Sequence, residues 1–208
     1  MDNVQHTEDK ILAAARQVFH HKGFNGARMQ EIADLAGINK ALLHYYFRNK
    51  ESLFEKVFNE TFSELASKMS EIFFSEMTLM SKIEIFVNFY VNFISQHPYI
   101  IHFIINALQE KPERLRDIIT RQNVSPGLFL ETIRKQLKEE MGLDIDPLHI
   151  YVNILGLVIF PVLAKPLIQS IFALQDDKME VFFEQRKQIV PTFISNALKG
   201  YGKDKILV

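Results

Sequence analysis

Residues 28–50 carry side chains whose chemistry suits contact with duplex DNA. Amine, amide, imidazole and phenol groups can form hydrogen bonds with base edges, while small apolar groups can contact the thymine methyl. The residues predicted to read bases are Gln30, Lys40, Ala41, Leu42, His44 and Tyr45. Arg28, Tyr46 and Lys50 are predicted to contact phosphates, and Lys40 on a guanine is the principal base contact that we expect.

A glycine at position 37 divides this segment into two predicted helices. In the first helix, Ile32, Ala33 and Ala36 fall on one face. Gly37 then supplies a residue that adopts a positive φ without a Cβ penalty, so the first helix must end there. The chain can therefore turn sharply before the second helix begins.

The second predicted helix follows Asn39, whose side-chain oxygen can cap the free N–H groups of the first turn. Asn39 is also one of the residues predicted to bind DNA. Leu43 and Phe47 are four residues apart and give this helix an inward stripe. The side chains between them therefore point mostly away from the core. Two short helices joined in this way have the layout of a DNA-reading helix-turn-helix.

A third helix is expected over residues 7–22, with Thr7 as its N-cap and Gly23 at its end. Three short helices bury little surface, so the start of a fourth helix is expected to complete their core. The predicted organisation is a helix-turn-helix domain over 1–50, a linking helix over 50–74, and a larger domain over 51–208.

Residues 14–58, AARQVFHHKGFNGARMQEIADLAGINKALLHYYFRNKESLFEKVF, resemble the DNA-binding signature of the tetracycline-repressor (TetR) family of bacterial transcriptional regulators. The pattern IVPTFISNALKG near the end of the chain is also similar. The resemblance implies an all-α homodimer whose N-terminal domains bind double-stranded operator DNA. It also implies that a small-molecule effector in the C-terminal helical bundle releases the DNA, with repression as the usual outcome.

The chain departs from the family pattern within the same segment. Family members usually carry Thr or Ser before the second helix, where this chain has Arg28, which could replace a phosphate contact but not a cap. The usual Gly/Thr pair of the recognition helix is Ala41-Leu42, and the usual Tyr-His order is inverted to His44-Tyr45. The operator preference of relatives therefore cannot be transferred to this chain.

Charge and composition agree with a globular DNA-binding protein. Of the 208 residues, 48% are hydrophobic, which is ample for a buried core. Residues 1–50 hold seven Lys/Arg against five Asp/Glu, whereas residues 51–208 hold 17 against 20. The basic part is the one expected to contact phosphates.

The chain has no cysteine, which excludes disulfides and thiolate metal sites. The N-terminal residues MDNVQHTEDK show neither the basic region nor the apolar run of a secretion signal. We expect a cytoplasmic protein.

Residues beyond 50 are predicted to be helical throughout, because proline and glycine breaks separate helix-length segments and no hairpin signal occurs. The expected helices span 50–74, 79–96, 98–109, 112–122, 125–141, 147–172 and 177–199, followed by a frayed tail over 200–208.

Fifteen of the eighteen phenylalanines lie beyond residue 50. They suit an ordinary core, and they also suit a cavity for an apolar or amphipathic effector. The expected effector-binding residues are Phe89, Asn92, His102, Asn106 and Tyr151. For each polar member, local packing or solvation remains the alternative.

The most apolar segment, ILGLVIFPVLA over 154–164, is shorter than the ~20 residues that a membrane-spanning helix needs, and it contains Pro161. We therefore expect no membrane partner, and we expect Pro161 and Pro191 to kink their helices. By family resemblance, the last two long helices form a four-helix dimer interface. Its expected residues are Ile154, Val158, Phe182, Ile189, Phe193 and Ile194.

The sequence contains no phosphate-binding glycine loop, dinucleotide motif, serine elbow or zinc-protease motif. We therefore expect no catalysis, no metal and no cofactor. Two alternatives remain open: a helical carrier of apolar ligands, in which the N-terminal helices are only a packing unit, and an uncharacterised helical enzyme. A carrier should show no salt-dependent binding to DNA.

Overall fold

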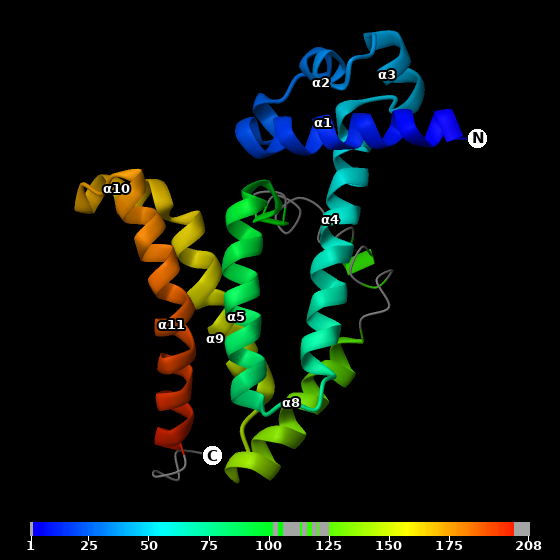
Figure 1. The fold of residues 1–208 in the computed structure, drawn as a ribbon. Helices are drawn as coiled ribbons and strands as arrows, with labels where there is room; N and C mark the ends of the chain where they lie inside the picture. Colours follow the sequence, from blue (N-terminus) through cyan, green and yellow to red (C-terminus); the bar gives the residue numbers. More distant parts are fainter. Residues whose placement is uncertain are drawn as a thin grey trace. The chain divides into compact units, whose positions relative to one another are not determined.

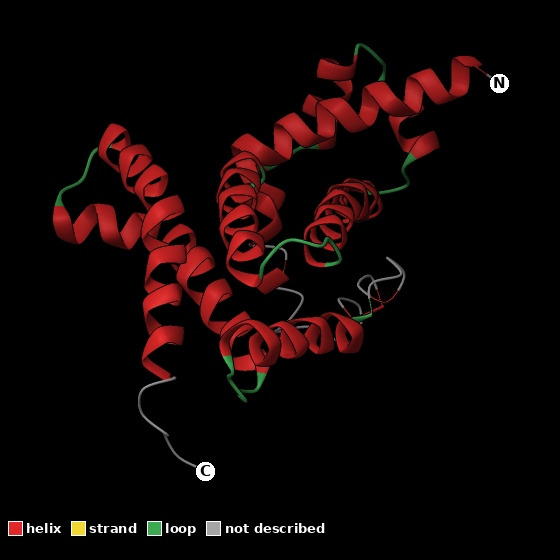
Figure 2. Ribbon diagram, turned by 60° about the horizontal axis from the view of Figure 1, so that its bottom comes forward, coloured by secondary structure: helices red, strands yellow, loops and turns green. Residues whose placement is uncertain are grey.

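The computed structural model describes residues 2–101, 104–105, 113, 116–117, 120 and 125–201 (Figure 1). Helices and their connections make up this part of the chain, and no strand occurs among these residues (Figure 2). The prediction of an all-α fold is confirmed. The chain forms two compact units: the first comprises residues 1–65 and 97–118, and the second comprises 66–96 and 119–208.

The first unit begins with α1 (Asp2–Gly26), α2 (Met29–Ala36), α3 (Lys40–Tyr46) and the first part of α4 (Lys50–Phe73). Helix α1 starts well before Thr7, so the prediction of Thr7 as its N-cap is wrong. The backbone is already helical before Thr7, so Thr7 lies inside the helix and cannot cap its end. Gly23 has φ 64° and ψ −179°, which interrupts α1 where the sequence predicted its end.

Aromatic side chains hold the first unit together. The ring of Phe54 on α4 lies edge-on to Phe19 at 4.8 Å and to Phe24 at 5.0 Å between centroids. Ile32 of α2 and Leu43 of α3 are fully buried in the same unit. The start of α4 therefore completes the helix-turn-helix core, as the sequence predicted.

The segment after α5 also belongs to the first unit. Residues 98–101 are helical, in agreement with the start of the helix predicted over 98–109. The hydroxyl of Tyr99 lies 3.1 Å from Oγ1 of Thr61, a buried residue of α4. The helix predicted over 112–122 lies outside the described residues, apart from a few isolated positions.

The second unit contains the end of α4, α5 (Leu79–Gln96), α8 (Pro126–Met141), α9 (Pro147–Leu163), α10 (Lys165–Phe172) and α11 (Asp176–Tyr201). Helix α5 packs against α8, α9 and α11, and α9 also packs against α8 and α11 (Figure 1). Ser125 and Asp146 cap α8 and α9 through their side-chain oxygens, and Gly142 ends α8 with φ 67°. These helix boundaries fall where the sequence placed its breaks.

The prediction of one helix over 147–172 is wrong, because the chain bends by 64° between α9 and α10. Pro161 lies inside α9, and the break comes at Ala164, just before Pro166 at the start of α10. Pro161 cannot donate to the carbonyl of Leu157, one turn earlier. The Nη2 of Arg186 on α11 donates to that carbonyl instead, at 2.6 Å, and so supports the helix across the proline.

Helix α11 continues through Gly200 to Tyr201, two residues beyond the end of the helix predicted over 177–199, so the predicted tail over 200–208 starts too early. The remainder of the predicted tail, residues 202–208, lies outside the described residues. In the part of the chain that the structure describes, no single helix has the length and apolar composition to cross a bilayer. Among the described helices, only α9 and α10 taken together, as a bent pair, have the required length and apolar composition.

Candidate nucleic-acid interface

Gly37 sets the angle between α2 and α3. It adopts φ 69° and ψ 31°, a left-handed conformation that favours glycine. Its N–H donates to the carbonyl of Asp34 at 3.2 Å, and the N–H of Ile38 donates to that of Ala33 at 3.0 Å. These bonds satisfy the last carbonyls of α2, and they confirm the predicted turn.

Asn39 fixes the start of α3. Its Oδ1 accepts a hydrogen bond from the N–H of Leu42 at 2.8 Å, which confirms the predicted N-cap. Leu43 and Phe47 are both buried, so they form the predicted inward stripe of this helix. Helix α3 packs against the unit through one face and is capped at its start, and its other face is exposed to solvent.

The free face of α3 carries the residues predicted to read bases. Tyr45 is 82% exposed, and its neighbour Tyr46 is half-buried with the two rings edge-on at 5.6 Å. The other predicted base-reading residues of this helix are also exposed: Lys40, Ala41, Leu42 and His44. The structure thus gathers on one surface the donors and small apolar groups that suit base edges.

Arg28 and Gln30 lie at the start of α2. Arg28 occupies the N-cap position in an extended conformation, is exposed, and makes no capping hydrogen bond with its side chain. This confirms that Arg28 does not replace the cap of Thr or Ser. The exposed Gln30 donates from Nε2 to Oδ1 of Asp34 at 2.8 Å, so part of its amide is already engaged.

Lys50 has partners within the first unit. Its Nζ donates to the carbonyl of Ala27 at 3.2 Å and lies 4.5 Å from the centroid of the Phe24 ring. Any phosphate contact must share the ammonium with these groups. Arg48, which the sequence reasoning did not select, is exposed directly after α3. A basic residue just past a recognition helix was the signal that could have identified it.

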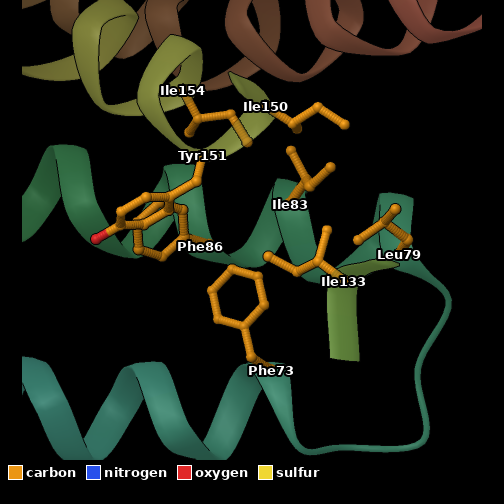
Figure 3. A pocket seen from close by; sticks show the side chains of 8 residues that line it. All are labelled: Phe73, Leu79, Ile83, Phe86, Ile133, Ile150, Tyr151 and Ile154. Carbon is orange, nitrogen blue, oxygen red and sulfur yellow. The ribbon is translucent and has the colours of Figure 1, made fainter. Parts of the chain in front are cut away.

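The predicted effector residues do not form one cluster among the described residues. Tyr151 lines a small cavity in the second unit, of about 10 Å³ (Figure 3). Phe89 is half-buried and Asn92 is exposed, and neither lines this cavity. His102 and Asn106 lie outside the described residues. The lining residues are Phe73, Leu79, Ile83, Phe86, Ile133, Ile150, Tyr151 and Ile154.

A buried lysine, missed by the sequence reasoning, lies beside this cavity. Lys82 is 2% exposed, and its Nζ donates to the carbonyl of Phe73 at 2.9 Å and to Oε1 of Gln136 at 2.8 Å. Burial lowers the pKa of Lys82, and nearby Glu140 opposes that shift. The lysine thereby fastens the last residue of α4 to α5 and α8.

The residues predicted for the dimer interface divide into two groups. Ile154, Val158 and Ile194 are buried in the core of the second unit, which leaves them little surface for a partner. Ile189 and Phe193 on α11 are 52% and 59% exposed, and Phe182 is half-buried.

Comparison with known proteins agrees with this geometry. Residues 11–57 match the family described as bacterial regulatory proteins, tetR family. The chain is 26% identical over 188 residues to the probable HTH-type transcriptional regulator YttP of Bacillus subtilis, covering 87% of this chain and 90% of that protein. It is 42% identical over 57 residues, 27% of each chain, to the HTH-type transcriptional repressor NicS of Pseudomonas putida.

The fold also resembles a solved regulator. The transcriptional regulator FadR from Bacillus subtilis, solved in complex with stearoyl-CoA, superposes with a TM-score of 0.59 at 19% identity. The match covers 89% of this chain and 96% of that chain. The relatives are transcriptional regulators of a non-enzymatic family. With its exposed α3, the N-terminal segment is therefore a DNA-binding segment of the tetR family of bacterial regulatory proteins, and the chain as a whole is similar to an HTH-type transcriptional regulator.

Proposed function

We propose that this regulator is a cytoplasmic homodimer that represses transcription from a near-palindromic operator and leaves it when a small, apolar or amphipathic effector binds the second unit. The observation that carries the proposal is the free face of α3, where Asn39 caps a helix whose exposed side chains suit base edges. Repression is supported by the local similarity to NicS, which is named a repressor.

On operator DNA, α3 of each subunit enters the major groove. The two half-sites lie roughly one helical turn apart, ~34–36 Å, since a twofold dimer requires a twofold site. Lys40, in the first turn of α3, donates to guanine, while Ala41 and Leu42 contact thymine methyls. Arg28 and Arg48 flank this surface and contact phosphates, which position the helix without reading sequence.

The dimer forms through α9 and α11, which are neighbours in the second unit. Helix α9 exposes Val152 and Phe160, and helix α11 exposes Val181, Ile189 and Phe193. Within each helix, consecutive members of this set are four or eight positions apart, so they follow one side of the helix. Apolar stripes of this kind favour contact with a second copy over contact with water.

The effector acts through α4, which contributes residues up to Leu65 to the first unit and the rest to the second. The second unit holds the apolar cavity, and Phe73 at the end of α4 lines it. The similarity to FadR, which was solved with stearoyl-CoA, supports an apolar effector. The effector can shift the DNA-binding equilibrium only by its difference in affinity between the two states.

The proposal is tested by selecting bound fragments from the source genome with the purified protein and then sequencing them. We expect enrichment of a site with twofold symmetry. A reporter gene placed behind that site should be expressed less when the regulator is present. Lack of any enriched fragment at low ionic strength, or increased reporter expression, would contradict DNA binding or repression respectively.

A further inference from the structure

The imidazole ring of His44 makes one hydrogen bond within the described residues. Its Nδ1 lies 3.2 Å from the carbonyl oxygen of Arg48, the residue that follows the C-cap of α3. A carbonyl oxygen can only accept, so the hydrogen of this bond is on Nδ1. The bond therefore fixes both the orientation of the ring and the nitrogen that carries its hydrogen.

The other ring nitrogen of His44 is then an acceptor. A neutral imidazole carries one N–H group, and with that hydrogen on Nδ1 the Nε2 atom presents only a lone pair. No group of the described residues forms a hydrogen bond or an ion pair with the ring beyond the Arg48 carbonyl. Because His44 is exposed, a group from outside the chain can reach this lone pair.

The position of His44 on α3 places it beside Lys40. The two residues are four positions apart, and both are exposed on the same face of the helix. Four residues rise ~6 Å along a helix, and successive base pairs are ~3.4 Å apart. With α3 in the major groove, His44 therefore reaches a base within about two steps of the one that Lys40 contacts.

The edges of the bases in the major groove limit what this nitrogen can bind. The hydrogen-bond donors there are the amino groups at N6 of adenine and N4 of cytosine. Guanine presents two acceptors, thymine presents an acceptor and a methyl group, and phosphate oxygens also accept. An Nε2 atom that accepts therefore has no partner on guanine, on thymine or on the phosphates.

We propose that His44 is a specificity-determining residue, which accepts a hydrogen bond through Nε2 from the amino group of an adenine or a cytosine in each half-site. This inference rests on the proposed function, since it requires α3 to lie in the major groove. The chain inverts the usual Tyr-His order of the family at His44-Tyr45, so the preference is a property of its own sequence.

The first test compares variants on the selected genomic site and its single-base changes, by fluorescence anisotropy at about pH 8, where a neutral imidazole is the usual state. His44→Ala should lose the preference for adenine or cytosine at one position of each half-site and keep the preferences elsewhere. His44→Gln retains an acceptor on its amide and should keep that preference. Arg48→Ala is the matched control: it preserves the carbonyl that orients the ring, and it should weaken all base changes alike.

The second test uses wild-type protein and modified bases at the position that His44→Ala identifies. If that base is adenine, purine, which lacks the amino group, should weaken binding about three- to tenfold, the range expected for one hydrogen bond. The analogue 7-deazaadenine, which keeps the amino group and lacks the N7 acceptor, should bind unchanged. If the base is cytosine, 2-pyrimidinone, which lacks the amino group, should weaken binding by the same factor.

Three outcomes would overturn the inference alone while DNA reading by α3 stands. A guanine or thymine preference that depends on His44, or a loss with 7-deazaadenine, would show that the ring donates to a base. An equal loss for every base in His44→Ala would show a phosphate contact, and an unchanged base preference would show no contact. Lack of any selected site would overturn both this inference and the proposed function.

Discussion

Arg48 and Lys50 are two cations near α3 that the structure places in different surroundings. Arg48 is exposed, whereas the Lys50 ammonium bonds to the carbonyl of Ala27 and lies over Phe24. Arg48→Ala should therefore weaken all DNA sequences alike and reduce the salt slope by about one counterion, with no loss of stability.

Lys50→Ala should in addition lower the free energy of unfolding by about 1–3 kcal/mol, because a charged hydrogen bond and a cation–π contact are lost. Thermal unfolding and DNA titrations over a salt series measure both effects. Equal stability of Arg48→Ala and Lys50→Ala would show that the internal contacts of Lys50 do not stabilise the fold. Lys50 would then act only as a phosphate contact.

His97 links stability to pH in the first unit. Burial lowers its pKa, an effect that His20 and Arg16 reinforce and Glu64 opposes. The unfolded chain therefore takes up the proton near pH 6.5, and the folded chain does so only at lower pH. Stability should fall as the pH drops below about 6.5, and His97→Gln should make that fall shallower. Urea unfolding of the wild type and of His97→Gln at several pH values gives the slope of the unfolding free energy against pH for each protein. Identical slopes would show that His97 is not the residue responsible.

Helix α9 continues past Pro161, and a side chain of another helix supplies a donor to the carbonyl that the proline leaves unpaired. Arg186→Met removes the bond to the Leu157 carbonyl and should cost about 1–3 kcal/mol of unfolding free energy. In a Pro161→Ala background the helix regains its own N–H donor, so the same Arg186 substitution should cost less. Denaturant unfolding of the two single variants and the double variant measures this coupling. If the losses of unfolding free energy in the two single variants simply add up in the double variant, Arg186 stabilises α9 in some other way.

The helices that the sequence predicted correctly are those with strong local signals at their ends. Gly37, Asn39, Ser125, Gly142 and Asp146 each act on backbone groups a few residues away, so their effect can be predicted from the neighbouring sequence. The exposed face of α3 could be predicted in the same way, from the spacing of Leu43 and Phe47 within the helix.

Other features depend on residues distant in the sequence. The break between α9 and α10 comes at Ala164, close to Pro166, while α9 itself includes Pro161, where Arg186 from α11 donates to the Leu157 carbonyl. Burial of Ile154 and Ile194, predicted for the dimer interface, depends on how α9 and α11 pack within one unit. The Lys82 network joins three helices, and a lysine in a helical sequence is usually exposed.

The whole molecule should exist as a dimer held by the exposed stripes of α9 and α11. Phe193→Asp places a charge in the middle of the proposed contact and should shift the protein to monomer at micromolar concentration. Loss of the dimer should also lower the affinity for a twofold operator, since two linked helix-turn-helix domains bind more tightly than one. Analytical ultracentrifugation measures the mass. Gln188→Glu, at an exposed polar position of α11, is the matched control, and a Phe193→Asp protein that stays dimeric would place the interface elsewhere.

The most direct measurement is the binding of wild type and Lys40→Ala to a selected genomic site and to each of its single-base variants, by fluorescence anisotropy at ~50 mM and ~200 mM salt. The wild type should bind the selected site tightly and lose affinity steeply with salt. Lys40→Ala should lose about 1–3 kcal/mol, confined to one guanine in each half-site. Salt-independent binding, or an unchanged base preference in Lys40→Ala, would contradict the reading of DNA by this face of α3.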